Sequence, residues 1–210
     1  MRLTKYVHSC LLVETLEATV LFDPGKFSWD SQLLDIGRLP KLDYIVITHE
    51  HSDHYELEFV KALAQKFPDI PIITNPELAP KISASGISNS LITDNKDGFE
   101  IFNAPHEPLP LDMPVVSNIG VHFNRLTHPG DAFDFSETRE ILALPLTAPW
   151  GSVTQALDAA VRLKPKIVMP VHDWHWHELA RQQMYGMSQS LLEPKGIKFI
   201  VPENGQPTEL

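Results

Sequence analysis

The chain has 210 residues, and 17 lysines and arginines against 27 aspartates and glutamates leave a formal net charge of −10. This length fits one domain over residues 1–210, and a composition of 43% hydrophobic and 21% charged residues excludes disordered, collagenous and coiled-coil proteins. The acidic balance disfavours long nucleic acids and anionic membrane surfaces as partners, because both are bound through Lys and Arg.

Apolar periodicity predicts strands that alternate with helices along the chain. The expected elements, in chain order, are a strand pair within 3–13 and 19–22, a loop with Phe27 and Trp29, a strand over 44–47, a helix over 57–67, a strand over 71–74, a helix over 76–85, a strand over 98–103, an irregular connection over 107–114, strands near 115–126 and 141–146, a helix over 152–163, a strand over 166–171, a helical region over 177–193 and a strand over 197–201. This order indicates an α/β or mixed layered fold rather than an all-β sandwich.

Cysteine usage and hydropathy bear on location. Cys10 is the single cysteine, so we expect neither an internal disulfide nor a Cys-rich zinc site. The apolar stretch 10–22 is interrupted by Glu14 and Glu17, which is unlike an export signal. No run approaches the ~18 apolar residues of a membrane span. We therefore expect a cytoplasmic protein with no membrane partner.

Ten histidines are the unusual feature of the composition, and three of them fall in one short polar loop. His49, His51, Asp53 and His54 follow the predicted strand at 44–47. Because residues two apart in extended chain point to the same side, His49 and His51 can share one metal ion, while the turn into the next helix aims Asp53 and His54 at a neighbouring position. The spacing excludes a helical His-Glu-x-x-His zinc-protease site, whose histidines are four residues apart.

Three further candidate ligands, His106, Asp131 and His172, lie at the ends of predicted strands or next to a turn. A catalytic two-metal site needs about three protein ligands per ion, and a carboxylate suits the shared position because each of its oxygens can bind one ion. We predict that Asp131 lies between the two ions. The other predicted ligands are His49, His51 and His106 for the first ion and Asp53, His54 and His172 for the second.

These motifs, from Thr48-His49-x-His51-x-Asp53-His54 through His106 and Gly130-Asp131 to His172, resemble the ordered metal motifs of the metallo-β-lactamase superfamily. The resemblance implies a four-layer αβ/βα sandwich of two mixed sheets with outer helices, and a metal-bridging hydroxide as nucleophile. Asp23 resembles an early aspartate that in the family is a structural hydrogen-bonding partner behind the metal loop. Segment 7–14 and the Asp23-Pro24-Gly25 turn look most like hydrolases related to ascorbate-6-phosphate lactonase.

The chain departs from the pattern of several branches of that superfamily. It lacks the cysteine ligand of true β-lactamases, and His51 stands where the diiron flavoproteins typically have Glu. Nothing in the chain has the length or charge of the arm with which the nucleases of the superfamily bind transfer RNA. The resemblance therefore implies a dinuclear hydrolase, and the histidine-rich ligand set favours two Zn²⁺ ions, with Mn²⁺ or Fe²⁺ also open.

The expected function is hydrolysis of a small ester, lactone, amide or phosphoester substrate. Asp53 would orient the nucleophile as well as bind metal, and His128 is a candidate general acid. His8 and His175 are candidate substrate-binding residues. The alternatives are a phosphodiesterase or nuclease of the same fold, and a non-catalytic metal-binding regulatory protein. The partner is a small molecule rather than a long nucleic acid, and homo-oligomerisation stays open.

Overall fold

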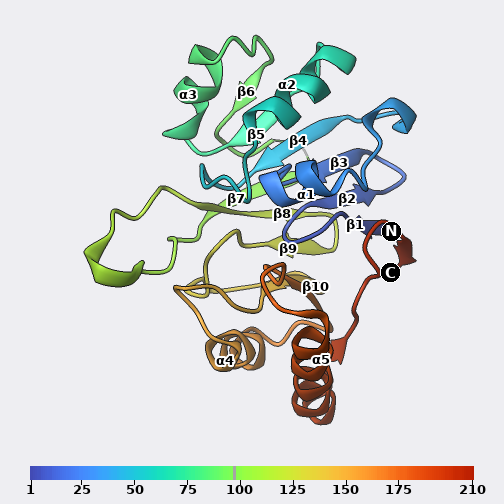
Figure 1. Ribbon diagram of the computed structural model, residues 1–210, viewed down its shortest axis with the longest axis vertical. Helices are drawn as coiled ribbons and strands as arrows, with labels where there is room; N and C mark the ends of the chain where they lie inside the picture. The colour runs from blue at the N-terminus through green and yellow to red at the C-terminus, as the bar shows by residue number, and fades with distance from the viewer. Residues whose placement is uncertain (97) are drawn as a thin grey trace. The chain divides into compact units, whose positions relative to one another are not determined.

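The computed structural model describes residues 1–96 and 98–210. The described chain forms two compact units, the first from residues 1–96 and 202–210 and the second from residues 98–201. Each unit has its own sheet (Figure 1). Each unit also has its own cluster of buried apolar side chains. The presence of two mixed sheets with helices confirms the predicted α/β class, whereas a single domain over 1–210 stays a prediction.

The first unit contains the N-terminal strands and the histidine-rich loop. Its strands are β1 (Arg2–Lys5), β2 (Leu11–Glu14), β3 (Thr19–Phe22), β4 (Tyr44–Ile47), β5 (Ile72–Thr74), β6 (Leu91–Ile92) and β13 (Pro207–Glu209), and its helices are α1 (Lys26–Ser31), α2 (Leu57–Lys66), α3 (Leu78–Ala84) and a 3₁₀ turn, η1 (Ile36–Arg38). Within the described residues the sheet order is β13-β1-β2-β3-β4-β5-β6. Pairing is antiparallel from β13 to β3 and parallel from β3 to β6.

Helices α2 and α3 provide the apolar cover of the parallel part of this sheet. Phe59 and Leu63 of α2 and Ile82 of α3 pack in one buried cluster with Ile45 of β4 and Ile72 of β5. Figure 1 shows both helices beside β5 and β6. Parallel strands are covered on their faces in this way, which is why β4 is a continuous apolar run.

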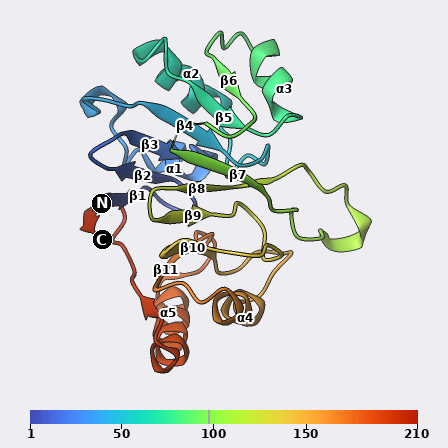
Figure 2. The same cartoon turned by 180° about the vertical axis from the view of Figure 1, so that it is seen from behind.

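The second unit repeats this plan with a separate mixed sheet. Its strands are β7 (Phe99–Asn103), β8 (Ile119–Phe123), β9 (Leu126–His128), β10 (Ile141–Pro145), β11 (Ile167–Val171) and β12 (Lys198–Phe199), and its helices are α4 (Val153–Leu163), α5 (Glu178–Leu192) and the 3₁₀ turns η2 (Pro110–Asp112) and η3 (Glu193–Lys195). The described strands lie in the order β12-β11-β10-β9-β8-β7, parallel from β12 to β9 and antiparallel from β9 to β7. Figures 1 and 2 both show α4 and α5 on the same side of these strands.

Two predicted elements differ from the structure near the N-terminus. The apolar run 3–13 is two strands rather than one, because Val7 and His8 adopt positive φ angles of 69° and 54° and reverse the chain between β1 and β2. The predicted loop containing Phe27 and Trp29 forms the short helix α1. The Trp29 ring lies 5.3 Å from that of Phe59 on α2, so a tertiary contact stabilises a helix that its own sequence does not favour.

The remaining differences concern short elements and boundaries. The predicted strand near 115–126 begins only at Ile119, and β9 is a separate strand from Leu126. Strands β6 and β13, of two and three residues, are too short to give a periodic signal. The predicted helix over 76–85 starts at Leu78, and the Asn75 side chain before it accepts hydrogen bonds from the amides of Glu77 and Leu78, as an N-terminal cap does. No helix among the described residues is long and apolar enough to cross a membrane.

Strand direction places the candidate ligands at one edge of each sheet. In the first unit Asp23 follows β3 and Thr48 follows β4, which pair in parallel. In the second unit β7, β9 and β11 run in the same direction, because β7 and β9 are both antiparallel to β8 and β9, β10 and β11 are parallel. The chain therefore reaches His106, Asp131 and His172 after leaving the same edge of its sheet, where side chains from separate strands can meet.

A glycine turn aims Asp131 at this edge. Gly130 has a φ angle of +61°, and a Cβ atom there would lie 2.0 Å from Asn118 Oδ1. The Asn118 amide is fixed, because it donates to the carbonyls of Ala104 (2.6 Å) and Pro129 (2.9 Å) and accepts from the Asp131 amide (3.3 Å). Only glycine satisfies both the positive φ angle and this close approach.

We expect Gly130→Ala to lower the free energy of unfolding more than Gly196→Ala does. Gly196 also has a positive φ angle, +78°, but a Cβ atom at that position would have none of the described atoms within 4 Å. Both variants bear backbone strain, whereas only Gly130→Ala disrupts the buried hydrogen bonds of Asn118, for a difference of about 1–3 kcal/mol. Urea unfolding of the two variants measures it, and equal destabilisation would contradict the proposed packing.

Candidate metal centre

Asp23 organises the polar loop after β4 from a fully buried position. Its Oδ1 accepts the Thr48 amide at 2.8 Å, and its Oδ2 accepts the Thr48 hydroxyl at 2.9 Å and lies 2.6 Å from His54 Nδ1. Because a carboxylate only accepts hydrogen bonds, His54 Nδ1 donates, and Nε2 of the neutral ring holds the lone pair. The sequence-based placement of Asp23 behind the loop agrees with this geometry.

The same hydrogen-bond chain sets the tautomer of His49. The Thr48 hydroxyl gives its one proton to Asp23, so it accepts from His49 Nδ1, which lies 3.0 Å away. Nε2 of His49 then has the lone pair as well. The His49 ring lies 4.8 Å from that of His51 and 4.1 Å from that of His54. The loop thus brings three imidazoles together.

The ligand atoms of the loop fall into two neighbouring sets. Those of His49 and His51 lie within 4.8 Å of one another, and so do those of His8, Asp53 and His54. Asp53 Oδ2 is 3.1 Å from His8 Nε2 and 3.9 Å from His54 Nε2. His49 and His51 thus fall in one set and Asp53 and His54 in the other, and their assignment to two separate ions stays a prediction.

Gly25 lets the loop pack against the turn after β3. A Cβ atom at Gly25 would lie 1.8 Å from the Asp53 carbonyl oxygen, which no side chain can avoid by rotating. Two backbone hydrogen bonds join the segments, from the Lys26 amide to Ser52 O (2.7 Å) and from the Glu56 amide to Pro24 O (3.0 Å). The sequence marked this glycine only as part of a turn, whereas the structure assigns it to the support of Asp53.

In the second unit Asp131 lies between two histidines. Its Oδ2 is 3.5 Å from His106 Nε2 and 3.3 Å from His172 Nε2. His106 Nδ1 donates to Glu107 O at 2.6 Å and His172 Nδ1 donates to Thr147 O at 2.7 Å. Backbone carbonyls only accept, so Nδ1 of each ring bears a proton and Nε2 of each ring faces the Asp131 side chain.

The structure also shows supports that sequence reasoning missed. The Glu107 amide donates to the Asp131 carbonyl at 2.9 Å, and Asn118 fixes the Asp131 amide. The Trp150 ring lies 5.8 Å from the His106 ring and 5.3 Å from the His172 ring, both edge-on. No sequence pattern marks Asn118 for this role.

His128, the predicted general acid, is fully buried at the end of β9. Its Nδ1 accepts the Gly130 amide at 3.2 Å, so Nε2 of the neutral ring bears the proton. His128 therefore has a donor nitrogen and also supports the turn that aims Asp131. Its role in proton transfer stays a prediction.

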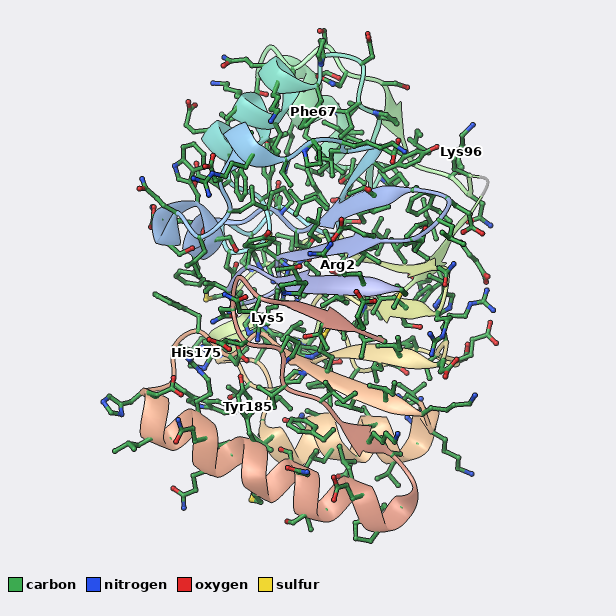
Figure 3. The ribbon with its side chains drawn as sticks, turned by 90° about the vertical axis from the view of Figure 1, so that its right-hand side faces the viewer. Arg2, Lys5, Phe67, Lys96, His175 and Tyr185 are labelled. Carbon is green, nitrogen blue, oxygen red and sulfur yellow. The ribbon has the colours of Figure 1, made fainter. Side chains whose placement is uncertain are left out.

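His175, a predicted substrate-binding residue, is exposed in the segment before α5, where Figure 3 labels it. Its ring lies 6.3 Å from that of His172. The segment is fixed by Arg181, whose guanidinium donates to the carbonyls of Asp173 (3.3 Å) and Trp176 (3.1 Å). Tyr185, on the same helix, donates to the Asp173 carboxylate, and burial, followed by the charge of Asp173, raises the pKa of this phenol. Substrate contact by His175 stays a prediction.

Cys10 and His122 carry groups that could react or bind metal, but neither belongs to the set of predicted ligands. Burial raises the pKa of the Cys10 thiol to about 12, so it stays protonated at neutral pH and is no nucleophile. Burial lowers the pKa of His122, which lies within 4.8 Å of Glu100 and Glu137. Arg139 pairs with Glu100 at 2.5 Å, so this carboxylate is already held in an ion pair.

The donor set fits divalent metal ions on its chemistry. Imidazole and carboxylate are ligands for zinc, manganese and iron. Metal binding needs neutral imidazole, and hydrogen bonds to Nδ1 fix the ligand tautomer in metalloproteins. Four of the predicted ligands, His49, His54, His106 and His172, have Nδ1 engaged in this way. The first unit holds His8, Asp23 and the four loop ligands, and the second holds His106, His128, Asp131, His172 and His175.

Comparison with known proteins agrees with these observations. The family model described as "Beta-lactamase superfamily domain" matches residues 2–172. Protein Rv0786c of Mycobacterium tuberculosis is 31% identical over 183 residues, which is 82% of this chain and 84% of that protein. A UPF0173 metal-dependent hydrolase of Nanoarchaeum equitans is 25% identical over 195 residues, which is 83% of this chain and 89% of that protein. The solved structure of the metallo hydrolase Igni18 of Ignicoccus hospitalis matches with a TM-score of 0.72 and 19% identity, covering 100% of this chain and 98% of that one. The chain therefore belongs to the metallo-β-lactamase superfamily.

Proposed function

We propose that this chain, a metal-dependent hydrolase of the metallo-β-lactamase fold, holds two divalent ions and cleaves a small ester, lactone, amide or phosphoester. One observation gives the strongest support to a site with two ions. Asp131 Oδ2 lies 3.5 Å from His106 Nε2 and 3.3 Å from His172 Nε2, and these two histidines are predicted to bind different ions. A carboxylate between ligands of two ions is in the position that a shared ligand needs.

The proposed ligands divide between the ions as the loop geometry divides them. His49 and His51 would bind the first ion together with His106, and Asp53 and His54 would bind the second together with His172. Asp131 would be common to both. The preponderance of imidazole favours Zn²⁺, and Mn²⁺ or Fe²⁺ would fit the same donors.

The protein residues then have distinct chemical tasks. Bound divalent ions supply a Lewis acid and an activated water at neutral pH. Asp53 would orient the nucleophile for addition to the carbonyl carbon or the phosphorus. His128 Nε2–H donates a proton to the leaving oxygen or nitrogen as its bond to the same atom breaks. Asp23 and Thr48 hold His49 and His54 in the ligand tautomer throughout.

There are two alternatives to this function, one with a different substrate and one that is not an enzyme. The net charge of −10 weighs against long polynucleotides but not against a small phosphodiester, because two dications would make the pocket locally positive. A non-catalytic metal-binding regulatory protein is the second alternative, and the complete set of seven predicted ligands favours catalysis over it. The lactonase-like branch, the cytoplasmic location and homo-oligomerisation stay predictions.

Metal analysis of the purified protein, with a hydrolysis panel of lactone, thioester and phosphodiester substrates, tests the proposal. We expect about two ions per chain in the wild type. Asp131→Ala should lose metal and activity, because the shared ligand is gone, whereas the exposed Asp134→Ala should keep both. Less than one ion per chain, unchanged in Asp131→Ala, would contradict the dinuclear centre.

Asp23→Asn should weaken metal binding, although Asp23 is not itself one of the predicted metal ligands. The amide has one oxygen in place of two, so it cannot accept from Thr48 and His54 as the carboxylate does. Loss of such an outer hydrogen-bond partner typically lowers metal affinity about 10–100-fold. Competition with a chelating dye measures the affinity, with the exposed Asp35→Asn as control. Equal affinities in both variants would remove Asp23 from this role.

His128→Ala should lower kcat most for substrates with a poor leaving group. Such substrates need a proton on the departing atom, and general-acid catalysis contributes about 10²–10⁴-fold. A substrate with a good leaving group is the internal control, and the metal content of the variant shows that the Asp131 turn is intact. An unchanged kcat on the poor-leaving-group substrate would exclude the acid role.

A further inference from the structure

We propose that His8 is a positioning residue that fixes the Asp53 carboxylate, and that the strained turn between β1 and β2 is retained to place it there. This inference rests on the proposed function, because it assigns His8 to the support of a predicted ligand rather than to contact with substrate. All the residues involved belong to the first unit.

The residues in the turn between β1 and β2 differ from those that tight hairpin turns usually contain. Strands β1 and β2 pair in antiparallel register up to Lys5 and Leu11, and the Cys10 amide donates to Val7 O at 3.1 Å. Val7 and His8 have consecutive positive φ angles of 69° and 54°. Turns with two such residues usually contain Asn-Gly or a similar pair. A β-branched valine in this conformation is an outlier.

Contacts from outside the hairpin hold the turn in this shape. The buried Ser28 hydroxyl, on α1, lies within hydrogen-bond distance of the carbonyls of Tyr6 and Val7. The His8 ring packs edge-on against Phe27 of the same helix, with ring centroids 5.1 Å apart. Strained backbone persists where its surroundings fix it in this way, and it clusters at functional sites.

The result of this arrangement is a buried imidazole directed at Asp53. The side chain of His8 is 1% exposed, that of Asp53 is 23% exposed, and His8 Nε2 lies 3.1 Å from Asp53 Oδ2. A hydrogen bond to Oδ2 fixes the rotation of the Asp53 carboxylate. It therefore also fixes the direction in which the carboxylate oxygens face the other predicted ligands. Asp53 Oδ2 lies only 3.9 Å from His54 Nε2, so a rotated carboxylate would change the ligand geometry directly.

A turn-filling role alone predicts a different residue at position 8. Asn or Gly would adopt the positive φ angle with less strain, but glycine has no side chain and that of asparagine is shorter than that of histidine. The chain has a histidine, which is strained at this position and is long enough. Local disagreement between sequence and backbone, combined with a contact to a candidate ligand, points to function.

Three variants separate positioning from turn stability. His8→Gly relieves strain and removes the imidazole, Val7→Gly relieves strain at the adjacent residue and leaves His8 intact, and His8→Gln keeps an N–H donor of similar reach. We expect the Zn²⁺ affinity of His8→Gly to fall about 10–100-fold. Val7→Gly should leave the Zn²⁺ affinity unchanged, and His8→Gln should recover a substantial part of the loss.

The affinities are measured by chelator competition and the geometry by the absorption spectrum of the Co²⁺-loaded protein, which should change in His8→Gly and not in Val7→Gly. Equal Zn²⁺ affinities and spectra in the wild type and His8→Gly would overturn the proposal. So would equal losses in His8→Gly and Val7→Gly, because a merely structural turn predicts them.

A measurement on metal-free protein keeps this inference separate from the proposed function. The Nε2 proton of His8, buried and bound to Asp53, should give a slowly exchanging ¹H–¹⁵N resonance that persists in Val7→Gly and is lost in Asp53→Ala. If the wild type binds no metal, the proposed function fails while this resonance still decides whether His8 holds Asp53. A resonance that is unaffected by Asp53→Ala would overturn the positioning role.

Discussion

The buried carboxylate of Asp23 is the interaction on which the histidine-rich loop depends. It lies where β3 and β4 end side by side, and it accepts from the Thr48 amide, the Thr48 hydroxyl and His54 Nδ1. A buried charge is tolerated when hydrogen bonds satisfy it, and these three donors do so. One residue therefore fixes the loop backbone and the tautomer of His54, and through Thr48 that of His49. The ligand geometry of the first unit follows from this network.

The second unit fixes the tautomers of its histidines through different hydrogen-bond acceptors. Backbone carbonyls, of Glu107 and Thr147, replace a buried carboxylate as acceptors for His106 and His172. Asn118 then fixes the turn that presents Asp131 between the two rings. Because carbonyl oxygens belong to the fold itself, loss of any one side chain outside this set leaves the histidine tautomers in place. The first unit thus concentrates its control in Asp23, whereas the second distributes it over the backbone.

The sequence predicted those parts of the molecule that depend on local pattern. The apolar run of β4, the close spacing of His49 and Asp53, and the positions of His106 and His172 after strands are all local features, and the structure places them as expected at strand ends. The missed parts depend on tertiary contacts. Helix α1 is stabilised by packing of Trp29 on Phe59, and Asn118 acts through atoms distant in sequence. The positive φ angles at Val7 and His8 are unusual for these residue types, so no turn motif in the sequence indicated them.

A crystal structure of the metal-loaded protein, with anomalous diffraction measured at the zinc edge, tests the central claim most directly. The account predicts two anomalous peaks about 3.5–4 Å apart, with Asp131 in contact with both and with His106 and His172 on different ions. A single peak, or two peaks of which neither touches Asp131, would contradict it.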